Sequence, residues 1–129
     1  MIYVDVKTGV LTSDGSGDAT KNVGSSIGKI YKIEVQNSAA SKPSDNWDLT
    51  IYSGTIGSPD YEEFFKDITI SQGVTAKIVY YPRKKVDLQD GTASTLTEEP
   101  CMIFNRDLKL IGANMGDTKV ATVKVFLVK

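Results

Sequence analysis

The sequence predicts an all-β domain, an antiparallel β-sandwich or jelly-roll-like barrel with at most one short helix. Segments rich in Val, Ile, Thr and Tyr alternate with clusters of Gly, Asp, Asn, Ser and Pro at spacings of about ten residues, as in antiparallel sandwiches and barrels. Almost no stretch has the period of a long helix. With 129 residues the chain is expected to form one domain, 1–129, which has room for a single core.

Two segments in the first half alternate apolar and polar residues with the period of two that marks a strand. The first, 29–35, places Tyr31, Ile33 and Val35 on one face and Ile30, Lys32 and Glu34 on the other. The second, 47–52, places Trp47, Leu49 and Ile51 inward and Asp48, Thr50 and Tyr52 outward. Because 36–45 is small and polar with one proline, we expect a loop there, and two strands that form a hairpin or are neighbours.

Five later segments also have strand composition, namely 64–70, 74–81, 101–105, 107–111 and 119–128. The last of them alternates most clearly, with Ala121, Val123, Val125 and Leu127 on one face. The opposite face carries Val120, Thr122, Lys124, Phe126 and Val128, and it is too apolar for open solvent. We therefore expect this face to be covered, with Phe126 as a possible contact residue.

Residues 59–67, PDYEEFFKD, allow two structures. Pro59 suits the first turn of a helix, and Glu62 and Glu63 suit a helix N-terminus, so one short helical turn is possible. An extended segment fits the same residues, and the sequence does not decide between them.

Two segments are expected to lie outside the sheets and to reach neighbouring subunits. Residues 82–100 form the most polar stretch of the chain, and we expect a long exposed loop there. Residues 1–10 contain IYVDV, whose alternating apolar side chains suit an N-terminal arm that adds a strand to another sheet.

The composition excludes much of enzyme chemistry. The chain has no histidine, which removes Ser-His-Asp and Cys-His sites and the usual zinc ligand sets. Its one cysteine, Cys101, has neither a disulfide partner nor an imidazole to activate it, so we expect a buried, inert thiol. A glycosidase that uses two carboxylates stays open, but no pair is singled out. We expect no enzyme activity and no cofactor.

The charge balance argues against nucleic acid and membranes as partners. Fifteen Lys and Arg residues face sixteen Asp and Glu residues, for a net charge of -1, so no global field attracts phosphate backbones or anionic lipid. No apolar run approaches the roughly 18 residues of a membrane span, and the N-terminus lacks the features of a signal peptide. We expect synthesis in a cytosol.

Three polar stretches are candidate sites. The run TSDGSGDAT, 12–20, could offer oxygens to Ca²⁺, but its spacing does not fit an EF-hand, and a Gly-rich turn whose aspartates bond local backbone amides is preferred. The run Arg83-Lys84-Lys85 could contact phosphate, but on a near-neutral protein a solvated loop is preferred. No metal site is expected.

The third stretch, 45–48, surrounds the only tryptophan with Asp and Asn. An exposed Trp47 with Tyr52 and nearby acids would suit a sugar, since the ring stacks on a pyranose and polar groups bind its hydroxyls. Alternation instead places Trp47 in the core, with Asp45 and Asn46 where a strand leaves a turn. The structural interpretation is preferred.

Three pieces of the sequence form a recognisable series: LTSDGSGDAT at 11–20, IGKIYKIEV at 27–35 and PSDNWDLTIY at 43–52. Together they resemble a family of small structural proteins encoded in tailed-phage genomes and prophages, and the closing GANMGDTKVATVKVFLV is similar to the family's end. The family has a Gly-Asp-Ala-Thr turn, a Gly-started strand and a Pro-Thr-Asp-Asn-Tyr-Asp-Ile-Thr-Leu-like segment in the same order. About half of the chain is covered; Trp47 replaces the more common tyrosine, and 53–105 does not follow the pattern.

The resemblance implies a β-sandwich that acts by assembly in a virion, made in the cytoplasm of the bacterial host. A head decoration or cement protein is the first expectation, and a head-to-tail connector or tail component is the other. Expected partners are copies of the chain itself and capsid or tail subunits. The alternative is a carbohydrate-binding β-sandwich module, for example for host attachment.

Overall fold

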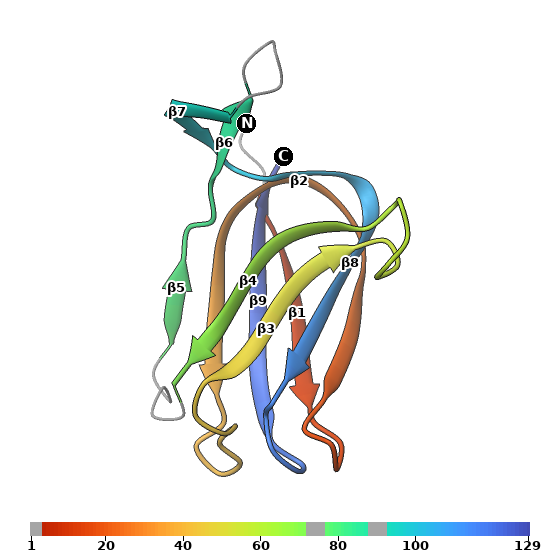
Figure 1. The fold of residues 1–129 in the computed structure, drawn as a ribbon, viewed down its shortest axis with the longest axis vertical. Helices are drawn as coiled ribbons and strands as arrows, with labels where there is room; N and C mark the ends of the chain where they lie inside the picture. Colours follow the sequence, from red (N-terminus) through yellow and green to blue (C-terminus); the bar gives the residue numbers. More distant parts are fainter. Residues whose placement is uncertain (1–3, 72–76, 88–92) are drawn as a thin grey trace.

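The computed structural model describes residues 4–71, 77–87 and 93–129, and it confirms the all-β fold (Figure 1). Within these residues every regular element is a strand. The strands are β1 (Val4–Thr12), β2 (Ala19–Asn37), β3 (Trp47–Ser53), β4 (Glu62–Ile70), β5 (Ile78–Tyr80), β6 (Lys84–Asp87), β7 (Ala93–Glu99), β8 (Met102–Ala113) and β9 (Val120–Val128).

Seven of the strands form one antiparallel sheet that folds over into two layers. The order is β1-β9-β2-β8-β3-β4. Strand β5 pairs with the second half of β2, on the edge that faces away from β9. The first half of β2 hydrogen-bonds to β8, whereas its second half hydrogen-bonds to β9 and β5. One layer is therefore β1-β9-β2-β5, the other is β2-β8-β3-β4, and β2 belongs to both. Strands β6 and β7 form a separate two-stranded sheet.

Strand β2 passes from one layer to the other through an arch at one end of the molecule (Figure 1). Its register against β8 shifts between Asn22 and Ser25 and again between Ser26 and Gly28. Gly24 and Gly28 have φ angles of 94° and 125°, which side chains with a Cβ rarely adopt. Such bulges bend a strand and increase its twist, so the two glycines allow β2 to turn the corner without ending.

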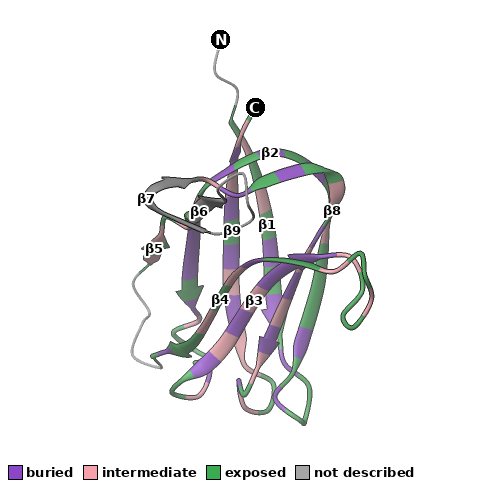
Figure 2. Cartoon of the chain, turned by 45° about the horizontal axis from the view of Figure 1, so that its top comes forward, coloured by how far each residue is buried: buried purple, intermediate pink, exposed green. Residues whose placement is uncertain are grey.

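The core fills the space between the two layers (Figure 2). Trp47 is fully buried on β3, and the face of β9 that carries Val123 and Leu127 is fully buried as well, as alternation predicts. Cys101 is buried as expected. The largest fully buried side chains are Trp47, Leu11, Ile30, Ile33, Leu49, Ile51, Ile70, Ile103, Leu108, Leu110, Met115 and Leu127.

One aromatic residue lies on the opposite face from the predicted one. Tyr31 is 47% exposed while Ile30 is fully buried, because the register of β2 against β9 shifts between Ile30 and Lys32 and reverses the alternation. Tyr52 lies on the predicted outer face, opposite Lys109 of β8, but it is buried there, and its ring lies 5.5 Å from that of Tyr61.

The structure decides one open assignment and corrects two others. Residues 62–70 are extended as β4 and pair with β3, so the extended alternative holds there and the helical turn is not formed. The segment 82–100 is not a simple loop, because β6 and β7 pair within it. Val4–Thr12 is not a free arm, because it pairs along its whole length with β9 of the same chain. The predicted strands 101–105 and 107–111 are joined in β8. Of the predicted strand 74–81, residues 78–80 form β5, and 74–76 lie outside the described residues.

Candidate interaction surface

The stretch around Trp47 is a structural element of the core. The indole Nε1 donates to Asn37 Oδ1 at 3.1 Å, and Asn37 Nδ2 donates to the carbonyl oxygen of Ser71 at 2.9 Å. Since the Trp47 ring is fully buried, it offers no face to a sugar, and the predicted sugar site with Trp47 and Tyr52 is wrong at this position. Asn46 has a φ of 58° in the turn before β3, and Asp48 Oδ2 accepts a bond from Asn114 Nδ2 at 2.9 Å.

The segment 12–20 is a turn held by its own aspartate, as preferred from the sequence. Asp14 Oδ1 accepts bonds from the backbone nitrogens of Ser16 and Asp18 at 2.9 and 3.1 Å. Within the described part of the chain, no group of three His, Cys, Asp or Glu side chains is placed to hold a metal ion.

Three of the sequence segments singled out above, 11–20, 43–52 and the closing segment, meet at the end opposite the arch, whereas 27–35 begins in the arch itself. Met115, in the closing segment, is fully buried beneath the loops and donates through its backbone nitrogen to the carbonyl oxygen of Gly17 at 2.9 Å. Its own carbonyl oxygen accepts from the Ser44 nitrogen at 2.8 Å. Main-chain bonds thus join the 11–20, 43–52 and closing segments.

The basic run lies at the start of the β6–β7 sheet. Arg83 is exposed, and its guanidinium donates to the carbonyl oxygen of Pro82 at 2.9 Å. The register of β6 against β7 places Lys84 opposite Glu99 and Lys85 opposite Glu98. The side chains of both lysines lie outside the described residues.

Phe126 lies half-buried on the outer face of β9, where a neighbouring strand supplies part of its cover. The Lys32 ammonium from β2 is 4.5 Å from the centroid of the Phe126 ring, a favourable cation–π geometry. Lys32 Nζ also lies 3.5 Å from the Glu34 carboxylate, and Lys77 Nζ lies 3.3 Å from it. This face is therefore less apolar than the sequence of β9 alone indicates.

Stability is expected to depend on the ionisation of Glu34. Burial raises the pKa of this carboxyl, but the hydrogen bonds and charges of Lys77 and Lys32 outweigh burial and hold the pKa below its usual value of 4.5. A pKa lowered in the folded state stabilises the protein above the unfolded pKa, and this contribution is lost as pH falls through the folded pKa. The wild type should therefore have a higher free energy of unfolding than Glu34→Gln at neutral pH, and this difference should become smaller below pH 4.5.

Denaturant titrations of both proteins between neutral and acidic pH measure this difference. The Lys77→Met variant is the control, because removing one partner should raise the folded pKa of Glu34 and make the pH-dependent loss of stability smaller. A difference between wild type and Glu34→Gln that does not change with pH would contradict the expected role of this ion pair.

An exposed apolar groove lies on the arch of β2. A groove of about 350 Å³ is bordered almost entirely by apolar atoms, and we call it the arch groove. It is lined by Ile27, Gly28, Lys29, Met102, Val128 and Lys129. The lining comes from β2 in the middle, the start of β8 on one side and the end of β9 on the other, since Lys29 pairs with both Met102 and Val128.

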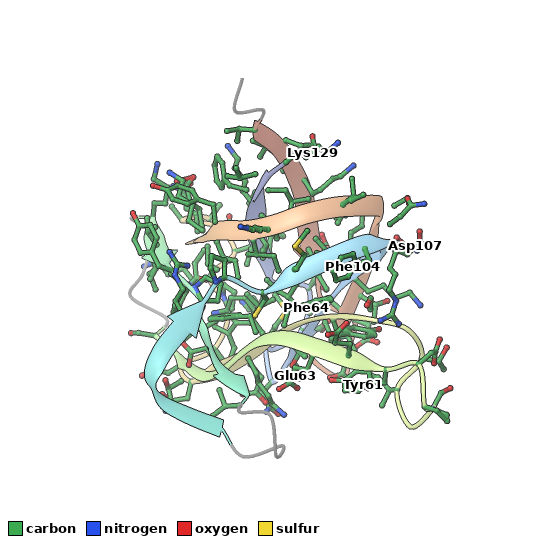
Figure 3. The ribbon with its side chains drawn as sticks, turned by 90° about the horizontal axis from the view of Figure 1, so that it is seen from above. Tyr61, Glu63, Phe64, Phe104, Asp107 and Lys129 are labelled. Carbon is green, nitrogen blue, oxygen red and sulfur yellow. The ribbon has the colours of Figure 1, made fainter. Side chains whose placement is uncertain are left out.

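Phe104 extends this apolar surface along β8. It is 69% exposed, and Met102 on the same face of the strand is exposed too, whereas Ile103 between them is buried. Figure 3 shows Phe104 and Lys129 on opposite sides of the arch. Phenylalanine side chains are usually buried in folded proteins. Exposed apolar side chains that lie together typically mark an interaction site.

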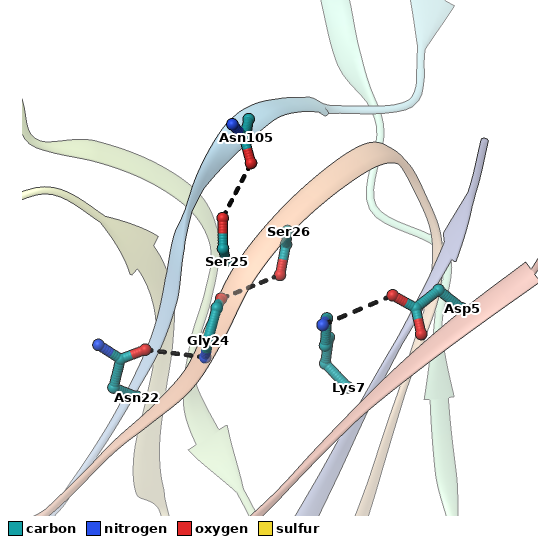
Figure 4. A network of polar contacts seen from close by, with 7 residues as sticks. All are labelled: Asp5, Lys7, Asn22, Gly24, Ser25, Ser26 and Asn105. Atoms are coloured by element: carbon teal, nitrogen blue, oxygen red, sulfur yellow. Dashed lines mark hydrogen bonds and ion pairs between the residues drawn. The ribbon is translucent and has the colours of Figure 1, made fainter.

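A bulge in β8 gives Phe104 this position. Between the pairs Gly28–Ile103 and Ser26–Arg106, strand β8 contains one residue more than β2. Asn105 in the bulge has a φ of 53°, and its Oδ1 accepts a bond from Ser25 Oγ at 2.9 Å (Figure 4). Alternation in the sequence does not mark Phe104 as exposed. The local signal is Asn105, which separates two apolar runs and belongs to a residue type that tolerates positive φ.

Comparison with known protein families, with curated proteins and with solved structures finds no match to this chain. None of the described residues forms a helix that is long and apolar enough to cross a membrane.

Proposed function

We propose that this chain is a structural component of a tailed-phage virion that acts by assembly and has no catalytic role. Head decoration or cement is the leading role, and a head-to-tail connector or tail component is the other. Its partners are copies of itself and capsid or tail subunits. The proposal is supported by the sequence resemblance and, above all, by the arch groove with Phe104 beside it.

The arch suits contact with another protein for two reasons. Ile27, Met102 and Phe104 are exposed together around the groove, and covering apolar surface stabilises a complex by roughly 25 cal/mol per Å². The bulges that form the arch belong to paired strands, so this surface is held in shape before a partner binds, which lowers the entropy lost on binding. A partner would be expected to place apolar side chains in the groove.

Replacing Phe104 with serine is expected to reduce the amount of protein on purified virions by about tenfold, since exposed apolar anchors dominate binding energy. Because the ring is mostly exposed, the free energy of unfolding should change by less than about 0.5 kcal/mol. Quantitative mass spectrometry of particles and denaturant titration of the free protein measure the two effects.

Ile56 offers a matched control, since it is 60% exposed but lies in the loop between β3 and β4 and not in the lining of the arch groove. Ile56→Ser should be found on particles at the wild-type level. Imaging of particles with the protein labelled then separates the roles: copies over the capsid support decoration, and signal at one vertex or on the tail supports the other role. Particles that lack the protein altogether would overturn the proposal.

A further inference from the structure

Strand β1 has a free edge. It stands at the end of the sheet order and pairs with β9 alone among the described strands (Figure 1). The backbone N–H and C=O groups on its other side can therefore hydrogen-bond to an added strand, as unpaired edges do in strand addition. Val4 and Val6 on this strand are 51% and 42% exposed, so the edge is flanked by apolar side chains.

The other edges near by carry features that oppose strand addition. In the arch of β2, the backbone of Gly24 is bonded locally, since its nitrogen donates to Asn22 Oδ1 at 2.8 Å and its carbonyl oxygen accepts from Ser26 Oγ at 3.2 Å (Figure 4). Strand β4 carries several charged side chains along its edge, and charges on an edge discourage pairing. Strand β1 carries two charged side chains between Val4 and Thr8, Asp5 and Lys7, and these have opposite signs.

The sequence of β1 is complementary to itself in one antiparallel register. If two copies of β1 pair about a two-fold axis at Val6, Asp5 of each copy lies opposite Lys7 of the other. Asp5 and Lys7 lie on the same face of β1, with Nζ and Oδ2 3.5 Å apart within one chain (Figure 4). Both side chains are partly exposed and can contact a partner. Opposite charges directly across a strand pair stabilise it.

The neighbouring registers are less favourable. An axis at Asp5 places two aspartates opposite each other, and an axis at Lys7 places two lysines opposite each other; like charges in this position destabilise a strand pair. Charge therefore selects the axis at Val6 over the registers on either side. In this register Val6 meets Val6 of the other copy, and Val4 meets Thr8.

We propose that two copies of this chain associate through Val4–Thr8 of β1, antiparallel and about a two-fold axis at Val6. The pairing joins the β1-β9-β2-β5 layers of both copies into one continuous sheet and brings the exposed Val4 and Val6 of each copy against the other. It deepens the proposed function by naming the contact between copies, and it is tested on the purified protein alone.

Charge exchange tests the register. Sedimentation equilibrium from about 10 µM to about 1 mM should show a dimer for the wild type. Asp5→Lys and Lys7→Asp should each raise the dissociation constant about tenfold or more, because each replaces two opposite-charge contacts with two like-charge contacts. The double variant, D5K with K7D, restores opposite charges and should return the constant to within about threefold of the wild type.

The control is Lys66→Asp on β4, which should leave the dissociation constant unchanged because that edge is not in the contact. If a single variant fails to fold, nuclear Overhauser contacts between Val6 of labelled and unlabelled wild-type copies decide the register instead. A wild type that is monomeric up to 1 mM, or a double variant as weak as the single ones, would overturn the pairing. Either result leaves the virion role standing, since that role is read from particles.

Discussion

Replacing Trp47 with alanine is expected to lower the free energy of unfolding by about 3–5 kcal/mol, the usual range for removing a large buried aromatic side chain. The ring is fully buried between the layers. Its removal leaves a cavity, and Asn37 Oδ1 loses the donor that lies 3.1 Å away. An unpaired buried acceptor adds to the loss.

Denaturant titration of three variants separates these effects. Trp47→Phe keeps much of the ring but removes the Nε1 donor, so its loss should be smaller, about 1–3 kcal/mol. Tyr31→Ala is the control, because Tyr31 is largely exposed and its removal should change stability by less than about 1 kcal/mol. A loss for Trp47→Ala no larger than that of Tyr31→Ala would contradict the burial of Trp47.

Replacing Gly28 with alanine is expected to be more damaging than the same change at Gly24. Both glycines lie in the arch of β2 with positive φ, so both variants suffer backbone strain of about 1–2 kcal/mol. At Gly28 the added Cβ would also lie 2.8 Å from the carbonyl oxygen of Val128, whereas at Gly24 no atom lies within 4 Å of it. The clash involves backbone on β9, which cannot move without disturbing the sheet.

Comparing the two variants isolates the close approach between strands, because the change of residue is the same. Gly28→Ala should lose at least about 1 kcal/mol more than Gly24→Ala, since overpacking typically adds 1–3 kcal/mol. Equal losses at the two positions would mean that φ alone, and not the contact with Val128, limits position 28.

The sequence predicts strands well where alternation is unbroken. Strand β9 was expected at 119–128 and β3 at 47–52, and the structure has them at Val120–Val128 and Trp47–Ser53 with the predicted inner faces for Trp47 and Leu127. These strands lie against the core on one face over most of their length, so the period of two reports burial directly.

Prediction failed where a bulge changes the phase of the alternation. Tyr31 was assigned to the wrong face because the period of two continues through the sequence, whereas the pairing of β2 shifts by one residue after Ile30. For the same reason β2 was found only as 29–35, although it begins at Ala19: its first half contains the bulges at Gly24 and Gly28. Bulges depend on which strands pair, and that information is not local.

The arch groove was not predictable from local pattern either. Its lining comes from β2, β8 and β9, and these segments lie far apart in the chain. The sequence drew attention to Trp47, because a single tryptophan among polar residues resembles a binding site, while the most exposed aromatic ring among the described residues is that of Phe104. Only the order of strands in the sheet shows which of these residues can be reached by a partner.

The passage of β2 through both layers determines how the protein would carry mechanical load. A pull on β1 is transmitted through its bonds with β9 to the second half of β2, and from there along a continuous backbone to the half that is bonded to β8. The two layers therefore cannot slide apart without breaking the pairing of one strand. A protein built in this way resists shear as a single body.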